Sequence, residues 1–223
     1  MSQTLPIQAI IWDFGGVLTS SPFEAFARYE LENGLPKDFI RRVNSVNPET
    51  HAWAMFEQAR LTEDEFDAQF LKESAHLGHR VSGRDVLALL SGTLRPNVVA
   101  ELKMLAADYK VGCITNNVPV SHADTLTSAT AKSQAIADVM AIFDHVLESA
   151  KIGFRKPDPK IYALMCEALD VKPAACVYID DLGINLKPAR QMGMRTIKVL
   201  DEAQLLADLD AVLGRDLVNL PSN

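Results

Sequence analysis

The chain has 223 residues, of which 48% are hydrophobic and 23% are charged, a composition typical of a folded globular protein and not of a disordered or collagen-like one. The formal net charge of −7 gives the surface no general attraction for phosphate backbones or anionic lipid, so we expect neither a nucleic-acid nor a membrane partner. No apolar run approaches the roughly 18 residues of a membrane span, and the first residues lack the basic and apolar regions of a signal peptide. Three cysteines without metal-binding spacing, Cys113, Cys166 and Cys176, are expected to be buried thiols in a reducing cytoplasm.

Five short apolar runs rich in Val and Ile indicate β-strands, and in chain order they cover residues 7–12, 111–114, 145–147, 176–179 and 195–199. Segments with helical spacing lie between the later runs, at 119–141, 158–169 and 184–192, and a last helix is expected at 201–213. Pro96 is expected to begin a helix toward Asp108, Pro188 to begin one after Asn185, and Gly193 to end that one. This alternation predicts an α/β fold with a Rossmann-like parallel sheet and helices on both faces.

Residues 19–95 interrupt the alternation, because they contain no convincing strand. They indicate amphipathic helices at 23–33, 36–44, 51–59, 62–77 and 83–91, and Thr62 with Glu65 forms a capping-box pattern. We therefore predict an α/β core made of residues 1–18 and 96–223, with an all-helical cap inserted at 19–95.

The residues that follow the predicted strands carry the candidate chemistry, because ligands of open α/β sheets bind beyond the carboxyl ends of the strands. Asp13 leads from the first strand into the Gly15-Gly16 turn, and Asp180-Asp181 follows the fourth strand. Taken separately, a turn aspartate and a solvated acidic pair are ordinary features. Taken together at neighbouring strands, three carboxylates repel one another and need a cation, and hard oxygen ligands suit Mg²⁺.

Two further residues complete this set. Thr115 ends the second strand with a hydroxyl that can hold an anionic oxygen together with the N–H groups that follow it. Lys156 precedes Pro157, which restricts it to an extended or turn conformation from which it can neutralise a carboxylate and a phosphoryl group. Alone, each has a commoner explanation, as a turn hydroxyl and a surface lysine. Their order along the chain, one group at each strand end, indicates a single site.

This ordered set resembles the haloacid dehalogenase-like (HAD) superfamily, which consists mostly of Mg²⁺-dependent phosphatases. The matching stretches are IIWDFGGVLTSSP, VGCITNN, KIGFRKPDPKIY and VYIDDLGINLKPARQMGM. The last two are most similar to the amino-terminal phosphatase domain of soluble epoxide hydrolase and its bacterial relatives. The resemblance covers residues 7 to about 200, and the insert at 19–95 stands where the family has its helical cap.

The resemblance implies roles for particular residues. Asp13 would be the nucleophile that forms an aspartyl-phosphate, Thr115 would bind phosphoryl oxygens, and Lys156 would steady the charge. For the substrate, the implied residues are Gly15, Gly16, Asn116 and Asn117. For Mg²⁺ they are Asp13, the Gly15 carbonyl, Asp180 and Asp181, with Asp180 acting through water or sharing the role. Asn185 would support the acidic pair. The implied partner is a small phosphorylated molecule, and we expect a cytoplasmic monomer or homodimer.

One position departs from the phosphatase pattern. Gly15 stands where the family has a second aspartate, which serves as general acid and base in a step worth about 10² to 10⁴ in rate. Two other interpretations therefore stay open: a dehalogenase-like hydrolase in which Asp13 attacks carbon, and a non-catalytic relative that binds phosphorylated ligands. Within the cap, four aromatic residues are either core or contacts for a leaving group: Phe23, Trp53, Phe56 and Phe66.

Overall fold

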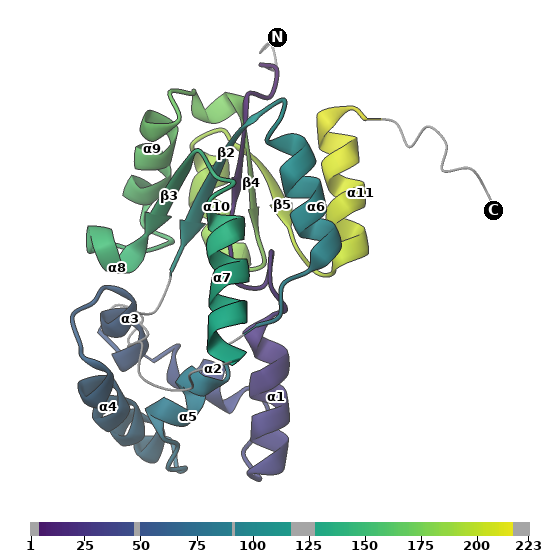
Figure 1. Ribbon diagram of the computed structural model, residues 1–223. Helices are drawn as coiled ribbons and strands as arrows, with labels where there is room; N and C mark the ends of the chain where they lie inside the picture. The colour runs from purple at the N-terminus through teal and green to yellow at the C-terminus, as the bar shows by residue number, and fades with distance from the viewer. Residues whose placement is uncertain (1–4, 47–49, 91, 117–127, 216–223) are drawn as a thin grey trace, which may run out of the picture.

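The computed structural model describes residues 5–46, 50–90, 92–116 and 128–215 (Figure 1). Its strands are β1 (Ala9–Trp12), β2 (Lys110–Thr115), β3 (His145–Glu148), β4 (Cys176–Asp180) and β5 (Arg195–Lys198). They form one sheet in the order β3-β2-β1-β4-β5, and every neighbouring pair is parallel. The predicted α/β fold with a parallel sheet is therefore confirmed, with strand ends shifted by one or two residues.

Helices cover both faces of this sheet. In chain order they are α6 (Pro96–Leu105), α7 (Ser128–Met140), α8 (Ser149–Ile152), α9 (Pro159–Ala168), α10 (Gly183–Gln191) and α11 (Glu202–Leu213), with a 3₁₀ turn at Pro173–Ala175. The central strand β1 is fully buried and contributes side chains to the apolar layer on each face of the sheet, because successive side chains of a strand point to opposite faces. Ile10 and Trp12 pack with apolar residues of α6 and α11, whereas Ile11 packs with those of α9 and α10.

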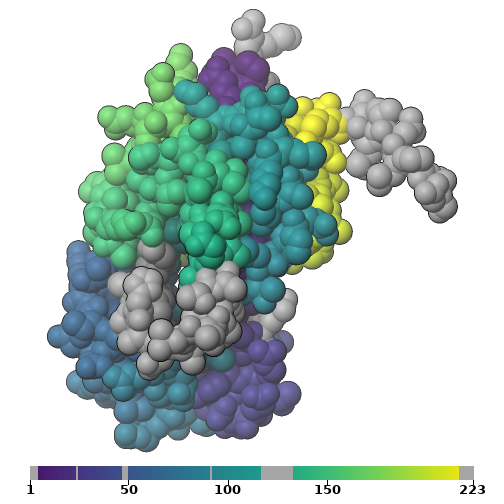
Figure 2. All heavy atoms as spheres, in the orientation of Figure 1, coloured from purple at the N-terminus to yellow at the C-terminus, as the bar shows by residue number. Residues whose placement is uncertain are grey.

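In the described part of the chain, five helices lie between β1 and α6, and they pack around an apolar cluster of their own. They are α1 (Pro22–Glu32), α2 (Phe39–Val43), α3 (Ala52–Glu57), α4 (Glu63–His76) and α5 (Gly83–Ala88). We call this group of helices the insert, and its atoms lie in the lower part of the molecule in Figure 2. All five lie within residues 19–95, whereas the division of the chain into two domains at these bounds stays a prediction.

Aromatic side chains fill the centre of the insert. Phe66 stacks on Phe56 at a centroid distance of 4.6 Å and meets Trp53 edge-on at 5.9 Å. Phe56 and Phe66 are fully buried, so of the four aromatic candidates these two are core, while Phe23 and Trp53 are only partly buried. The helix α4 begins as predicted, since Thr62 and Glu65 form a reciprocal capping box.

The two chain segments that join the insert to the core run side by side. Thr19 and Leu94 form an antiparallel bridge. The N–H of Ser20 donates to the carbonyl of Thr93 at 2.8 Å, and the N–H of Arg95 donates to the carbonyl of Leu18 at 2.9 Å. The bridge is a small piece of extended structure at the ends of a range in which no strand was expected.

Three local features differ from or extend the sequence interpretation. Pro188 lies inside α10 and does not begin it, so that prediction is wrong. The proline leaves the carbonyl of Ile184 without its intrahelical donor, which costs little because Ile184 is exposed and close to the start of the helix. Gly193 does follow the end of α10, with a φ of 97°. The short helix α8 was not expected, and residues 119–127 of the helix predicted at 119–141 lie outside the described residues.

Two expectations from composition can be compared with the structure. All three cysteines are free and buried, as predicted. Among the helices of the described residues, none has the length and the apolar character needed to cross a membrane.

Candidate active site

Three aspartates meet at the carboxyl ends of β1 and β4. Trp12 pairs with Ile179 in the sheet register, and the N–H of Asp13 donates to the carbonyl of Ile179 at 2.8 Å, which places Asp13 opposite Asp180. One carboxylate oxygen from each of Asp13, Asp180 and Asp181 lies within 4.8 Å of the other two. The sheet order reverses between β1 and β4, so this is the point where open α/β sheets bind ligands.

A buried lysine lies between two of these carboxylates. The ammonium of Lys156 is 2.7 Å from Asp13 Oδ1 and 2.9 Å from Asp180 Oδ2, and its side chain is only 1% exposed. Asn116 holds the main chain of this lysine, because its amide donates to the Lys156 carbonyl at 3.1 Å and its Oδ1 accepts from the Lys156 N–H at 2.9 Å. The Asn116 side chain, expected at the substrate, therefore holds the lysine in place.

Asp180 is surrounded by hydrogen-bond donors. The Asn185 amide donates to both of its oxygens at 3.0 and 3.1 Å, and the Leu182 N–H donates to Oδ1 at 2.8 Å. The hydroxyl of Tyr178 and the ammonium of Lys156 both donate to Oδ2. A fully buried carboxylate with this many donors is rigidly oriented. Both oxygens of Asp180 are already occupied by donors, so its main role is to hold Lys156 in place.

Sequence reasoning missed the two tyrosines behind this acid. Tyr178 precedes Asp180 by two residues on β4 and so points to the same face of the sheet. The hydroxyl of Tyr162 on α9 donates to the Asn185 carbonyl at 2.7 Å, and its ring meets Tyr178 edge-on at 5.1 Å. The alternation along β4 was a signal that could have identified Tyr178, whereas Tyr162 reaches the site from the helix α9.

The turn after Asp13 distinguishes its two glycines. Gly16 has a φ of 77°, and a Cβ on it would lie 2.4 Å from Asp181 Oδ2. Gly15 has no heavy atom within 4 Å of a Cβ built on it and is exposed to solvent. The turn therefore requires glycine at residue 16 for Asp181 to approach, but it imposes no such requirement at residue 15.

The second strand ends beside this cluster. Thr115 is the last residue of β2 and is 6% exposed, and β2 pairs directly with β1. Its hydroxyl thus comes from the strand next to Asp13. Asn117, the other residue predicted for substrate on this loop, lies outside the described residues.

Burial and mutual repulsion shift the pKa values of the acids. Burial raises the pKa of Asp13 well above its ordinary value, and the charges of Asp180 and Asp181 add to that rise while Lys156 opposes it. Burial and the neighbouring Asp180 raise the pKa of Asp181 to about 6. Burial alone would lower the pKa of Lys156, yet Asp13 and Asp180 raise it above its ordinary value, so the lysine is charged. The site thus holds more negative charge than one lysine balances, which a divalent cation would relieve.

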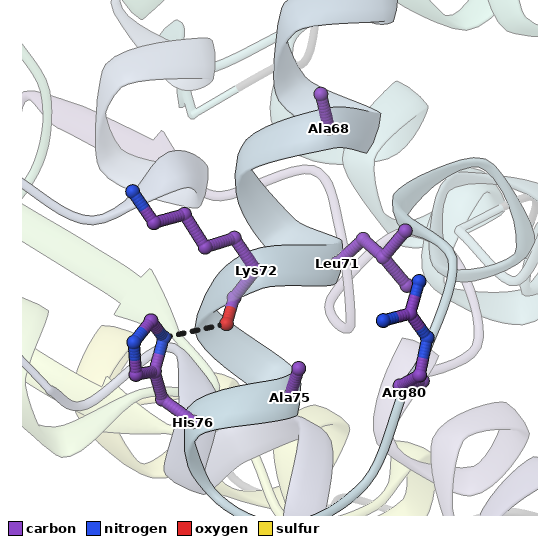
Figure 3. Close-up of a pocket in the computed structure, with 6 residues that line it drawn as sticks. All are labelled: Ala68, Leu71, Lys72, Ala75, His76 and Arg80. Carbon is purple, nitrogen blue, oxygen red and sulfur yellow. Dashed lines mark hydrogen bonds between the residues drawn. The ribbon is translucent and has the colours of Figure 1, made fainter.

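Two surface clefts lie on the insert, away from these residues. One of about 400 Å³ runs along α4 and is shown in Figure 3. It is lined by Ala68, Leu71, Lys72, Ala75, His76 and Arg80. The other, of about 410 Å³, is lined by residues of α2 and of the turns on either side of it. In the first cleft the His76 ring nitrogen Nδ1 is already bonded to the carbonyl of Lys72 at 2.8 Å, and neither cleft includes a strand-end residue.

Comparison with known proteins adds family relationships to this geometry. A protein-family model described as haloacid dehalogenase-like hydrolase matches residues 7–193 of the chain. Bifunctional epoxide hydrolase 2 of Sus scrofa is 27% identical over 98% of this chain, which spans only 41% of that relative. A protein of Mycobacterium tuberculosis named as a phosphatase is 28% identical over 87% of this chain and 88% of its own length.

Two solved structures resemble the fold. A HAD family enzyme from Bacteroides thetaiotaomicron, in complex with magnesium and inorganic phosphate, covers 90% of this chain and 98% of its own, with a TM-score of 0.59 and 19% identity. L-2-haloacid dehalogenase from Xanthobacter autotrophicus, with chloropropionic acid covalently bound, covers 97% of this chain and 90% of its own, with a TM-score of 0.57 and 18% identity. At this identity the likeness is one of fold.

Proposed function

Because the chain belongs to the haloacid dehalogenase-like hydrolase family, we propose that it hydrolyses a small phosphorylated compound with Mg²⁺, through an aspartyl-phosphate on Asp13. The observation that carries this proposal is the buried ammonium of Lys156, which contacts both Asp13 and Asp180. A carboxylate beside a fixed cation is suited to attack an anionic phosphoryl group, because the cation offsets the repulsion between them. The relative named as a phosphatase supports the same reaction class.

The donor set fits a magnesium ion. Three carboxylates each offer an oxygen within 4.8 Å of the others, and hard oxygen ligands of this kind suit Mg²⁺. Asp13, Asp181 and the Gly15 carbonyl would hold the ion directly, and Asp180 would act through water because both of its oxygens already accept hydrogen bonds. When bound, the ion supplies positive charge that neutralises the phosphoryl oxygens.

The proposed reaction has two displacements at phosphorus. First, a carboxylate oxygen of Asp13 forms a bond to phosphorus while the bond to the leaving oxygen breaks and its electron pair stays on that oxygen. A water molecule then attacks phosphorus, the bond to Asp13 breaks, and inorganic phosphate leaves. Over both steps one water is consumed: one proton goes to the leaving alcohol and the hydroxyl stays on phosphate. Thr115 and Lys156 hold the phosphoryl oxygens throughout.

In the part of the chain that the structure describes, this site lacks an evident donor of the proton that the leaving oxygen needs. Gly15 carries no acid, and among the described contacts no carboxyl group reaches Asp13 other than Asp180 and Asp181, which belong to the acidic cluster. We infer that the enzyme prefers substrates whose leaving group needs little protonation, such as acyl or aryl phosphates.

A dehalogenase-like reaction is the second candidate, and Gly15 is the observation that favours it. Displacement of halide from carbon by Asp13 needs no proton donor, so a glycine at residue 15 would cost nothing there. Three converging carboxylates favour the metal-dependent reaction instead, because carbon attack needs no acidic cluster. A non-catalytic binder of phosphorylated ligands would retain the cluster without turnover.

A substrate screen distinguishes these functions. Aryl, acyl and alkyl phosphates and 2-haloacids are incubated with the protein in Mg²⁺ and in chelator, with Asp13→Asn as the control. We expect phosphate release that needs both Mg²⁺ and Asp13. Metal-independent halide release would assign the dehalogenase-like reaction, and ligand binding with no turnover of any compound would assign the binding protein.

A further inference from the structure

The insert docks onto the core next to the candidate active site. The last residue of α3 is Glu57, and its carbonyl accepts a hydrogen bond at 2.7 Å from the hydroxyl of Ser149, a fully buried residue that begins α8. Ser149 directly follows Glu148, which pairs with Thr115 in the sheet register. The end of α3 therefore contacts the edge of the sheet at which the aspartates and Lys156 meet.

A buried ion pair strengthens this contact. Arg155 Nε lies 2.6 Å from Glu57 Oε2, and the two side chains are only 22% and 8% exposed. The indole N–H of Trp53 donates to Glu57 Oε1 at 2.9 Å, so each oxygen of this carboxylate has a partner. Charges withdrawn from water are tolerated when they are paired in this way, and the loss of either partner leaves the other charge uncompensated.

The pair is adjacent in sequence to the active-site lysine. Arg155 precedes Lys156 in the segment 153–158, which joins α8 to α9 and has no helix or strand of its own. In the core, this segment is held at Lys156 by the side chain of Asn116. The ion pair supplies a second anchor one residue earlier, and that anchor comes from the insert.

We propose that Glu57 is a positioning residue: through Arg155 it holds the segment 153–158 so that Lys156 reaches Asp13 and Asp180 while α3 is docked on the core. The inference rests on the proposed function for its kinetic test, but the contact that it describes exists without substrate. Docking of the insert and correct placement of the lysine thereby become one event.

A different role for Glu57 has to be separated from this one. Burial raises the pKa of Glu57, while Arg155, Trp53 and Lys156 oppose that rise, and a raised pKa suits a proton donor that could replace the one absent at Gly15. The contacts favour positioning, because Oε1 accepts from the indole N–H of Trp53 and Oε2 is paired with the guanidinium of Arg155. The two roles differ in which substrates they affect.

The kinetic test uses Glu57→Gln, Arg155→Gln and the double variant in the full chain with Mg²⁺, on p-nitrophenyl phosphate and on an alkyl phosphate. Glu30→Gln is the matched control, since Glu30 is also a buried glutamate of the insert, and its carboxylate accepts from the Asp38 and Ile40 N–H groups within the insert. Arg155→Lys, which keeps the charge, is the conservative rescue. Thermal unfolding of every variant verifies that it is folded.

A second measurement does not depend on turnover. The chain has two tryptophans, and Trp12 is fully buried in the core, so quenching by acrylamide reports mainly on Trp53. Arg155→Gln leaves the Trp53 to Glu57 hydrogen bond in place and removes only the guanidinium that is paired with the Glu57 carboxylate. Increased quenching in this variant is therefore expected if the ion pair docks the insert.

We expect both single variants to lose about 10- to 100-fold in kcat, by the same factor on both esters, because a misplaced group affects every substrate alike. The double variant should lose no more than either single one, Arg155→Lys should recover most of the activity, and Glu30→Gln should match the wild type. A loss confined to the alkyl phosphate would identify Glu57 as the proton donor and overturn the inference, as would wild-type kcat and quenching in Arg155→Gln. A wild type without phosphatase activity would refute the proposed function, and the quenching result would then decide the docking contact alone.

Discussion

Gly16 and Asp181 approach each other so closely that a Cβ on residue 16 would lie 2.4 Å from Asp181 Oδ2. The φ of 77° at Gly16 is a second reason for glycine there, since residues with a side chain rarely adopt it. Gly15, one residue earlier, has no positive φ and open space where a Cβ would stand. The two neighbouring glycines thus form a matched pair for mutation.

Gly16→Ala is expected to lower the free energy of unfolding by about 1–2 kcal/mol because of its backbone conformation alone, and to weaken Mg²⁺ binding by displacing Asp181. Gly15→Ala is expected to change neither quantity. Chemical denaturation and calorimetric Mg²⁺ titration of both variants measure these effects. Equal Mg²⁺ affinity in the two variants would show that Asp181 is not a ligand or that it moves without cost.

Asp13→Asn is expected to abolish hydrolysis while the fold is kept, since an amide is nearly isosteric but a poor nucleophile. Its oxygen can still accept from the Phe14 N–H, which is 2.6 Å from Asp13 Oδ1, and Lys156 keeps Asp180 as its partner. Because the change also removes a carboxylate from a repelling cluster, the melting temperature should hold or rise. Turnover at the wild-type rate in this variant would exclude Asp13 as the nucleophile.

The pH dependence of stability in the ion-free protein should carry the signature of Asp181. Burial raises its pKa to about 6 from an ordinary 3.8, so between these values the folded chain holds more protons than the unfolded chain. Stability from this group is therefore complete below pH 3.8 and is lost as the pH rises through about 6, by roughly 3 kcal/mol at most.

The measurement compares the wild type with Asp181→Asn by urea denaturation from pH 4 to 7.5, in chelator and in Mg²⁺. In chelator, the free energy of unfolding of the wild type should fall relative to that of Asp181→Asn as the pH rises. Added Mg²⁺ should stabilise only the wild type, by about 2.7 kcal/mol at a hundred times its Kd. A difference between the two proteins that does not vary with pH would contradict the raised pKa.

Gly15→Asp tests whether the missing proton donor limits the enzyme. The structure permits the change, because nothing lies within 4 Å of a Cβ at residue 15. Wild-type turnover should depend steeply on the pKa of the leaving group, and the variant should gain up to about 10²-fold on alkyl phosphates. Phosphate esters of increasing leaving-group pKa, assayed on both proteins, measure this dependence. Equal wild-type rates on alkyl and aryl esters would show that another residue supplies the proton.

The fold could be predicted because its signals are local. Short apolar strands, helical spacing between them and the capping box at Thr62 each require only neighbouring residues, and all three recur in the structure. Pro188 shows the limit of such rules, because a proline was taken to start a helix that begins five residues earlier at Gly183. A rule based on local sequence does not take into account that Ile184, whose carbonyl loses its donor, is an exposed residue.

The strand ends of the candidate site were predictable for a different reason: parallel strands place their carboxyl ends at one edge, so Asp13 and Asp180 had to be close. The groups that orient them were not predictable. Asn116 holds the main chain of Lys156, which is 40 residues away in the sequence, and Glu57 at the end of α3 pairs with Arg155 in the segment 153–158. Such partners depend on how distant segments pack, which no spacing along the chain records.

The bridge between Thr19 and Leu94 brings the chain back to almost the place from which it departs. The segment between these residues is therefore inserted into the core at a single place, and the hydrogen bond from Ser20 to Thr93 holds its two ends together. A group of helices of another length or sequence could be grafted there without moving a strand of the sheet. Such an exchange would keep the strand ends that carry Asp13 and Asp180, but the new helices would have to supply a partner for Arg155 in place of Glu57.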